Sequence, residues 1–292
     1  MTLAEVLVLV AIVGVVVMIV LTALPRQREL ARNVACQKNL SQIGRAIVLT
    51  DESAGRLPGV PPLGAEPAGP GPLATMLDAL GQEDFSALSP ERKAPGRLAN
   101  PTKAPRRIPG FLCPSDPNAL SNLFHAPVSY RATTGSQPDG RDGAFAPGRR
   151  LSLAQVEAGD GQSFTAAFSE RLVGDGRDEE ATTNYAVVPG GLPAEGVRVV
   201  PGASWKGDAG SSWLEATWRS TLYNHAIRPQ AAPSFLASDG RAARMGASSG
   251  HDGHVYLLMF DGAVRPVARG IDPAVWKALA NTDDGASRSK PK

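Results

Sequence analysis

The apolar positions of the chain are concentrated in its first two dozen residues. From Val6 to Leu24 there is no charged residue, and Thr22 is the single side chain with a hydroxyl group. At ~1.5 Å of rise per residue, a helix over this run would span roughly 28 Å, close to the thickness of a bilayer core. The pattern therefore predicts a transmembrane segment over residues 1–24.

The pattern changes after Pro25, where a helix either ends or kinks. Apolar residues then recur at mostly three- and four-residue steps, and Arg, Gln, Lys and Asn fill the other positions. This spacing predicts an amphipathic stem helix over residues 25–50, continuous with the first segment through a kink. Its narrow apolar stripe consists of Leu30, Val34, Cys36, Leu40, Ile43 and Ile47. A sheet of the same chain is the expected partner of this stripe.

Residues 51–110 no longer show the spacing of apolar residues that predicts the two helical segments before them. Proline removes hydrogen-bond donors and glycine raises chain entropy, so this Pro/Gly-rich stretch is predicted to be a variable insertion with long loops. One short helix is expected from about residue 73 to residue 80.

Residues 111–270 read as a β-rich head. Short strands are expected at 111–113 (leading into a Pro-Ser-Asp-Pro turn), 128–132, 163–170 and 184–188, and Ser152 with Gln155 forms a possible capping box. Two apolar runs flank Asp261-Gly262, which predicts a hairpin because Asp-Gly favours turns with positive φ. In residues 271–292, Asp272 and Pro273 are predicted to start a helix that a polar tail follows. The predicted fold class is α+β, a long N-terminal helix packed on an antiparallel sheet.

Composition changes this picture little. The 292 residues include 30 basic and 28 acidic side chains, so charge gives no reason to expect a nucleic-acid partner. Counts of 31 Gly and 25 Pro agree with a head rich in turns.

The start of the chain resembles that of type IV pilins and pseudopilins. An apolar first residue, Thr2-Leu3, Glu5 and an apolar helix follow one another as in that family. The resemblance implies that Met1 is the N-methylated residue exposed by a prepilin peptidase. It also implies that Glu5 pairs with the amino terminus of an adjacent subunit during filament assembly. From the residues alone, Glu5 could instead lie in the lipid headgroup region.

The basic leader of pilins, which ends in Gly, is not in this sequence. The chain is therefore expected to be the mature form, to start downstream of its true start, or to escape processing. Arg26, Arg28 and Arg32 follow the apolar run, and by the positive-inside rule they would place the rest of the chain in the cytoplasm. A basic leader would reverse that balance, and the motifs further along favour export.

A second resemblance lies near the other end. His251, nine further residues and then Asp261-Gly262 form a motif typical of a large bacterial pilin-like family that is expanded in planctomycetes. Members of that family pair this motif with a prepilin-type N-terminus. The further matches are Cys36 with Asn39-Leu40 and Gln42-Ile43-Gly44, Cys113-Pro114-Ser115-Asp116, Ser129-Tyr130, Ser169-Glu170-Arg171 and Val264-Arg265.

The chain has two cysteines, Cys36 and Cys113. An exported chain could join them in one disulfide that ties the stem helix to the head, and the alternative is two unpaired thiols.

Candidate catalytic and metal-binding residues are few. His251 and His254 have usable spacing for metal ligands, but a structural site needs four ligands, so the expected role of His251 is a hydrogen bond to backbone or to Asp261 that fixes the hairpin. The segment Gly246–Gly250 matches G-x-S-x-G without the strand and helix that this motif requires. The interpretation is that the chain is not an enzyme and needs no cofactor.

The sequence thus predicts a structural pilin-like subunit that assembles through its N-terminal helix in a pilus or in a type II secretion-like system. The expected partners are the membrane, other pilin-like subunits or copies of the same chain, and a prepilin peptidase if a leader exists. The expected location is the inner membrane, crossed once, with the head outside the cytoplasm or in a cell-surface fibre. The alternative is a membrane-anchored binding module for glycan or another surface ligand.

Overall fold

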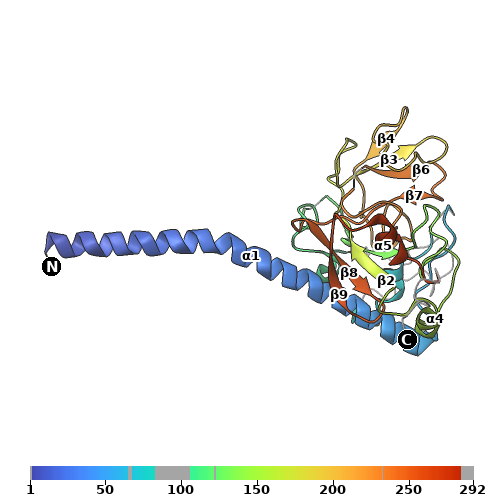
Figure 1. The fold of residues 1–292 in the computed structure, drawn as a ribbon, viewed down its shortest axis with the longest axis horizontal. Helices are drawn as coiled ribbons and strands as arrows, with labels where there is room; N and C mark the ends of the chain where they lie inside the picture. Colours follow the sequence, from blue (N-terminus) through green and yellow to red (C-terminus); the bar gives the residue numbers. More distant parts are fainter. Residues whose placement is uncertain (1, 65–67, 83–105, 122, 232, 284–292) are drawn as a thin grey trace.

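A long helix projects from a head that contains all the strands (Figure 1). The computed structural model describes residues 2–64, 68–82, 106–121, 123–231 and 233–283, and for residues 19–26 it describes the backbone alone. The helix α1 runs from Leu3 to Ala54, 52 residues in all, or about 78 Å at the usual helical rise. The stem is therefore one continuous helix with the N-terminal segment, as predicted, and it changes direction along its length (Figure 1).

Local signals explain both ends of α1. At the start, the Thr2 hydroxyl accepts from the Glu5 backbone N–H and the Glu5 carboxylate accepts from the Thr2 N–H, which is a capping box. At the end, Gly55 adopts a φ of 66°, a left-handed conformation that glycine tolerates without strain.

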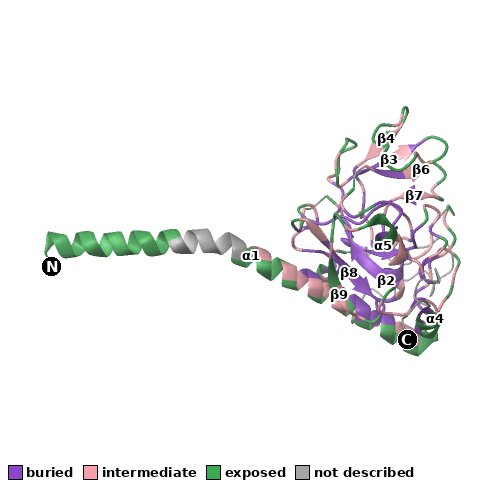
Figure 2. Cartoon of the chain, viewed as in Figure 1, coloured by how far each residue is buried: buried purple, intermediate pink, exposed green. Residues whose placement is uncertain are grey.

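The two halves of α1 differ sharply in burial (Figure 2). Residues 2–18 are all exposed, including Leu3 at 80% and Met18 at 68%. The buried face begins at Cys36. The predicted stripe is therefore wrong at its first two positions, since Leu30 is 52% and Val34 is 65% exposed. These two residues lie before Cys36, where α1 reaches the core of the head.

Within the described part of the chain, no helix is long and apolar enough to cross a membrane. The predicted transmembrane segment, residues 1–24, includes residue 1 and the side chains of residues 19–24, which lie outside that part.

The head contains two mixed sheets, not the single antiparallel sheet predicted. The five-stranded sheet has the order β5-β1-β2-β8-β9 and the four-stranded sheet the order β4-β3-β6-β7. Most strand pairs are antiparallel, but β1–β5 and β3–β6 are parallel. The strands of the first sheet are β1 (Tyr130–Thr133), β2 (Ala166–Glu170), β5 (Leu222–Tyr223), β8 (His254–Met259) and β9 (Val264–Ala268). Those of the second are β3 (Tyr185–Val188), β4 (Ser204–Lys206), β6 (Ser234–Ala237) and β7 (Ala243–Arg244).

Helices cover both faces of the first sheet. Leu258 on β8 faces α1, where a Cβ added to Gly44 would lie 3.1 Å from its Cδ1 atom. Val255 and Leu257 face the other way, into a cluster with Trp276 of α5 (Pro273–Ala278). A strand buried on both faces reads as a continuous apolar run, which explains the sequence of β8.

Several local predictions are confirmed. Strands form within or across the predicted ranges 128–132, 163–170 and 184–188, the hairpin is β8–β9, and Ser152 and Gln155 form the capping box of α4 (Leu153–Ala158). Asp272 caps α5 as expected. In the hairpin turn, Gly262 has a φ of 82° and Asp261 is not among the described residues with positive φ.

Two local predictions are wrong. The expected strand at 111–113 is replaced by the short 3-10 helix η3 (Pro109–Phe111) and a turn, because Pro109 favours a helical start. The expected helix at 73–80 is reduced to α2 (Pro72–Thr75), followed by turns.

The predicted insertion contributes to the core. Leu57, Val60, Leu73 and Met76 are buried in the same apolar cluster as the stem residues Leu40 and Ile43. Residues 65–67 and 83–105 of this region lie outside the described residues.

Candidate functional site

His251 joins the stem helix to the head. Its buried imidazole lies in the segment before β8, with Nδ1 3.1 Å from Oε1 of Glu29 on α1. Its Nε2 atom lies 3.2 Å from Oε1 of Glu170, the last residue of β2, and 3.6 Å from Sγ of Cys113. The Ser115 hydroxyl also donates to Glu29. One histidine therefore bridges two carboxylates that are far apart in sequence.

The two carboxylates set the charge of this junction. Burial alone lowers the pKa of His251, but the hydrogen bonds and negative charges of Glu170 and Glu29 outweigh it, so the pKa of His251 lies above its usual range. Partial burial raises the pKa of Glu29, but its bonds to His251 and Ser115 outweigh that effect and hold it below the usual range. Both shifts favour a protonated imidazole beside an ionised Glu29.

A disulfide joins Cys36 of α1 to Cys113, with the two Cα atoms 5.0 Å apart. This is one of the two outcomes that the sequence left open. The bridge closes a sequence separation of 77 residues and lies beside the His251 ring. It ties the buried half of α1 to the head covalently.

Uncharged hydrogen bonds complete the junction. The hydroxyl group of Tyr256 on β8 donates to the Asn33 side chain and accepts from Gln37, both on α1. Asn39, further along α1, donates to the carbonyl oxygen of Leu112. Contacts of α1 with the head therefore extend from Glu29 to the apolar face around Ile47.

The His-x9-Asp-Gly motif does not bring its ends together. His251 lies before β8 and Asp261-Gly262 forms the turn after it, so the spacing reflects the length of one strand. The Asp261 carboxylate accepts from the Ala263 N–H and lies 3.5 Å from Arg265. The predicted bond between His251 and Asp261 is therefore wrong; His251 fixes the stem to the head, and Asp261 fixes the turn.

The remaining predicted residues lie outside the Glu29–His251–Glu170 bridge. His254 stacks beside His251, with ring centroids 5.3 Å apart, and its Nδ1 atom contacts the backbone oxygen of Asp252. Glu5 lies at the exposed end of α1, in the capping box with Thr2. Met1 lies outside the described residues.

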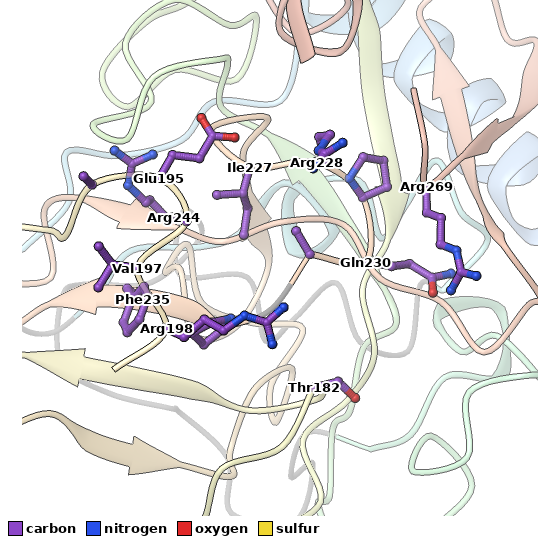
Figure 3. Close-up of a pocket in the computed structure, with 15 residues that line it drawn as sticks. Thr182, Glu195, Val197, Arg198, Ile227, Arg228, Gln230, Phe235, Arg244 and Arg269 are labelled. Carbon is purple, nitrogen blue, oxygen red and sulfur yellow. The ribbon is translucent and has the colours of Figure 1, made fainter. Parts of the chain in front are cut away.

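A second feature of the head is an open cleft of about 600 Å³ (Figure 3). Arginines from four segments line it: Arg198, Arg228, Arg244 and Arg269. Arg244 donates to the backbone oxygens of Pro193 and Ala226, whereas no ion pair joins the other three to a carboxylate among the described residues. Figure 3 shows Arg198 and Arg269 reaching the cleft from opposite sides. This arrangement favours an anionic ligand.

Gln230 connects the cleft to the His251 segment. It is the one described residue other than glycine with a positive φ, at 57°. Its side-chain amide donates to the backbone oxygens of His251 and His254. Gln230 lines the cleft, so it links the cleft directly to the backbone of the His251 segment.

Glu29, Glu170 and the arginine cleft were not predicted from the sequence. Glu170 stood within a matched segment, but nothing local shows that its carboxylate is buried. Glu29 lies on the polar face of a predicted helix, where a solvated carboxylate is the ordinary expectation. The arginines are spread over 72 positions, from 198 to 269, and no short pattern unites them.

The fold and the junction define a mixed α/β protein in which one long N-terminal helix is fastened to a two-sheet head. Residues 25–274 match the family described as "Protein of unknown function (DUF1559)", and the chain belongs to this family. The matched range covers the stem and the head and begins after the exposed half of α1. Neither a curated protein nor a solved structure matches the chain.

Proposed function

We propose that the chain is a structural, pilin-like subunit that assembles through the N-terminal half of α1. One observation carries the proposal. Residues 3–18 form an exposed helical surface built almost wholly of Val, Leu, Ile, Ala and Met. Contiguous apolar surface of this kind mostly marks an interaction site. We propose that the same half of α1 in neighbouring copies of the chain covers this surface.

Glu5 is the polar exception on this surface. In the single chain its carboxylate accepts from the Thr2 N–H within the capping box. In an assembly, the proposed partner is the amino terminus of an adjacent copy, with Met1 as the N-methylated residue. Burial among apolar helices would strengthen such a pair, because charges attract more strongly at low dielectric.

The proposed location is the inner membrane, with the head outside the cytoplasm. The apolar helix half supports a lipid environment before assembly. The Cys36–Cys113 disulfide supports an oxidising compartment for the head, since such bonds are rare in the cytosol. A prepilin peptidase and other pilin-like subunits are the proposed partners, with no nucleic acid, no cofactor and no enzymatic activity.

The test is a Glu5→Ala chain compared with Glu52→Ala, a matched control near the other end of the same helix, where the side chain is also exposed. Fibres sheared from cells, or complexes cross-linked in the membrane, are separated by size and quantified. The proposal expects Glu5→Ala to abolish assembly and Glu52→Ala to leave it intact. Intact fibres in the Glu5→Ala strain would contradict the assembly role.

The second candidate is an anchored binding module, and the arginine cleft favours it. Guanidinium groups that line a cleft suit the carboxylate or sulfate groups of an acidic polysaccharide. Titration of the full chain with polygalacturonate should show salt-sensitive binding that the double variant Arg198→Gln/Arg269→Gln weakens and Arg265→Gln, outside the cleft, does not. Equal affinities of all three proteins would rule out the cleft as the binding site.

A further inference from the structure

Four potential metal ligands meet beneath α1. They are Cys36 of α1, Cys113 after η3, Glu170 at the end of β2 and His251 before β8. All four residues are buried, and one ligand atom from each lies within 4.8 Å of the others. Two thiolates, an imidazole nitrogen and a carboxylate oxygen are donors that zinc accepts in four-coordinate sites.

The distances fit a tetrahedral ion. With usual zinc–ligand distances, a sulfur and a nitrogen on one ion lie about 3.6 Å apart, and a nitrogen and an oxygen about 3.4 Å apart. The observed distances are 3.6 Å between Cys113 Sγ and His251 Nε2, and 3.2 Å between His251 Nε2 and Glu170 Oε1. The two sulfurs, bonded in the disulfide, would have to separate to about 3.8 Å.

The surroundings hold two of these ligands in place. His251 Nδ1 lies 3.1 Å from Glu29 Oε1, which leaves Nε2 facing the other ligands. A carboxylate on the far ring nitrogen is the usual support of a metal-bound histidine. Glu170 Oε2 accepts from the Tyr256 N–H, while Oε1 faces His251 Nε2 at 3.2 Å. Loss of the Nε2 proton would therefore leave both of these atoms able to coordinate a cation.

We propose that Cys36, Cys113, His251 and Glu170 bind one zinc-class divalent cation when the two cysteines are reduced, so that the disulfide and the metal are alternative fastenings of α1 to the head. A dithiol breaks the S–S bond, becomes a disulfide itself and leaves two thiols on the chain. The cation then displaces the two thiol protons and the proton on His251 Nε2. Three protons leave as the four metal–ligand bonds form.

The test uses the full chain in mild detergent, either oxidised or reduced with a dithiol that is removed under nitrogen. Cobalt(II) is titrated as the probe, and zinc is then added to displace it. The expected result is one cobalt per reduced chain, with the sulfur-to-cobalt absorption of a tetrahedral thiolate site, and no binding by the oxidised chain. Absence of that absorption in the reduced chain would overturn the proposal.

Variants assign the ligands. His251→Gln and Glu170→Gln should each weaken cobalt binding by at least about tenfold, and Glu29→Gln, at the half-exposed supporting position, by about 10–100-fold. His254→Gln is the matched control, since its Nδ1 atom contacts the Asp252 backbone, and should leave affinity unchanged. Because Glu29 lies on the stem and outside the core, its variant retains the head and tests the site even if a ligand variant fails to fold. Equal affinity of Glu29→Gln and the unaltered chain would contradict the proposed geometry.

Discussion

The two halves of α1 show how one continuous helix can do two different things. Residues 36–47 bury an apolar face that includes Cys36, Leu40 and Ile43 against the head. Residues 3–18 are more apolar still, yet every one of them is exposed. Helical structure follows from local propensity and capping, whereas burial requires a partner. The exposed half is therefore the surface through which we propose that the chain assembles.

The bonds that hold α1 to the head follow the same division of the helix. The disulfide and the contacts of Glu29, Asn33, Gln37 and Asn39 all lie in the second half of the helix. In the first half, the side chains of Thr2 and Glu5 form hydrogen bonds within the first turn of the helix. Changes in the two halves should therefore affect different properties.

Removing the disulfide should have the largest effect on stability. For a closed loop of about 78 residues, the chain-entropy argument gives a loss of roughly 4–5 kcal/mol in the free energy of unfolding for Cys36→Ser/Cys113→Ser. Urea unfolding followed by tryptophan fluorescence, in the presence of a chelator, measures it. An unchanged midpoint would show that the hydrogen bonds and apolar contacts fasten α1 without the bridge.

Removing the imidazole of the junction should have the next largest effect. His251→Gln leaves the buried Glu170 carboxylate without its cation, and breaking a buried pair in this way costs about 3–5 kcal/mol. His254→Gln should change the free energy of unfolding by no more than about 0.5 kcal/mol. Similar losses of unfolding free energy in His251→Gln and His254→Gln would mean that the Glu29–His251–Glu170 bridge contributes no more to stability than the neighbouring histidine does.

The face of the sheet away from α1 offers a pH test. His225 is buried, its ring stacks on Trp276 at 3.5 Å between centroids, and burial lowers its pKa to about 3, only partly offset by its bond to the Trp276 backbone oxygen. The unfolded chain, in which the pKa of this histidine is 6.5, takes up a proton as pH falls below that value, whereas the folded chain does so only near pH 3. The contribution of neutral His225 to the free energy of unfolding is therefore complete above pH 6.5 and is lost as pH falls towards 3. Between pH 6.5 and 4.5 the loss is roughly 2–3 kcal/mol.

Asp116 acts in the opposite direction, so the test needs a paired variant. Burial raises the pKa of Asp116 to about 6, from 3.8 in the unfolded chain. The contribution of Asp116 to the free energy of unfolding is therefore complete below pH 3.8 and is lost as pH rises through 6. The difference in unfolding free energy between His225→Gln and the unaltered chain removes the Asp116 effect. We expect that difference to shift towards the variant by roughly 2–3 kcal/mol as pH falls from 6.5 to 4.5. A difference independent of pH would contradict a neutral, buried His225.

The smallest effect on stability should come from the exposed half of α1. Val13→Ser should change the free energy of unfolding of the head by less than about 0.5 kcal/mol. Leu40→Ala, in the buried half, should cost about 2–5 kcal/mol. Thermal unfolding of the two variants in the same detergent makes the comparison. If Val13→Ser destabilises the head as much as Leu40→Ala does, the two halves are not independent.

Much of the fold could be predicted because its signals are local. Capping residues at Ser152 and Asp272 mark helix starts, and the Asp261-Gly262 pair marks the hairpin turn. The division into two sheets could not be predicted, because the parallel pairing of β3 with β6 joins segments about 50 residues apart without a local signature. From the sequence, short strands of two mixed sheets therefore cannot be told apart from the strands of one antiparallel sheet.

Some residues of the site could be predicted from the sequence, but their arrangement could not. His251 and both cysteines were identified, but the partners of the histidine were not. A buried carboxylate such as Glu170 looks the same in sequence as a solvated one, and only the fold brings it to within 3.2 Å of the ring. The arginine cleft depends in the same way on four segments that the fold brings together, three of them loops and one the strand β7.

Photo-cross-linking in the native membrane tests assembly through α1. A benzophenone amino acid is placed at Leu7, in the exposed half of α1, or at Val199, an exposed head position, and the membrane is irradiated. We expect Leu7 to cross-link to a second copy of the chain or to another pilin-like subunit, and Val199 not to do so. Cross-links from Leu7 to lipid alone would contradict assembly through this helix and favour an anchored binding module.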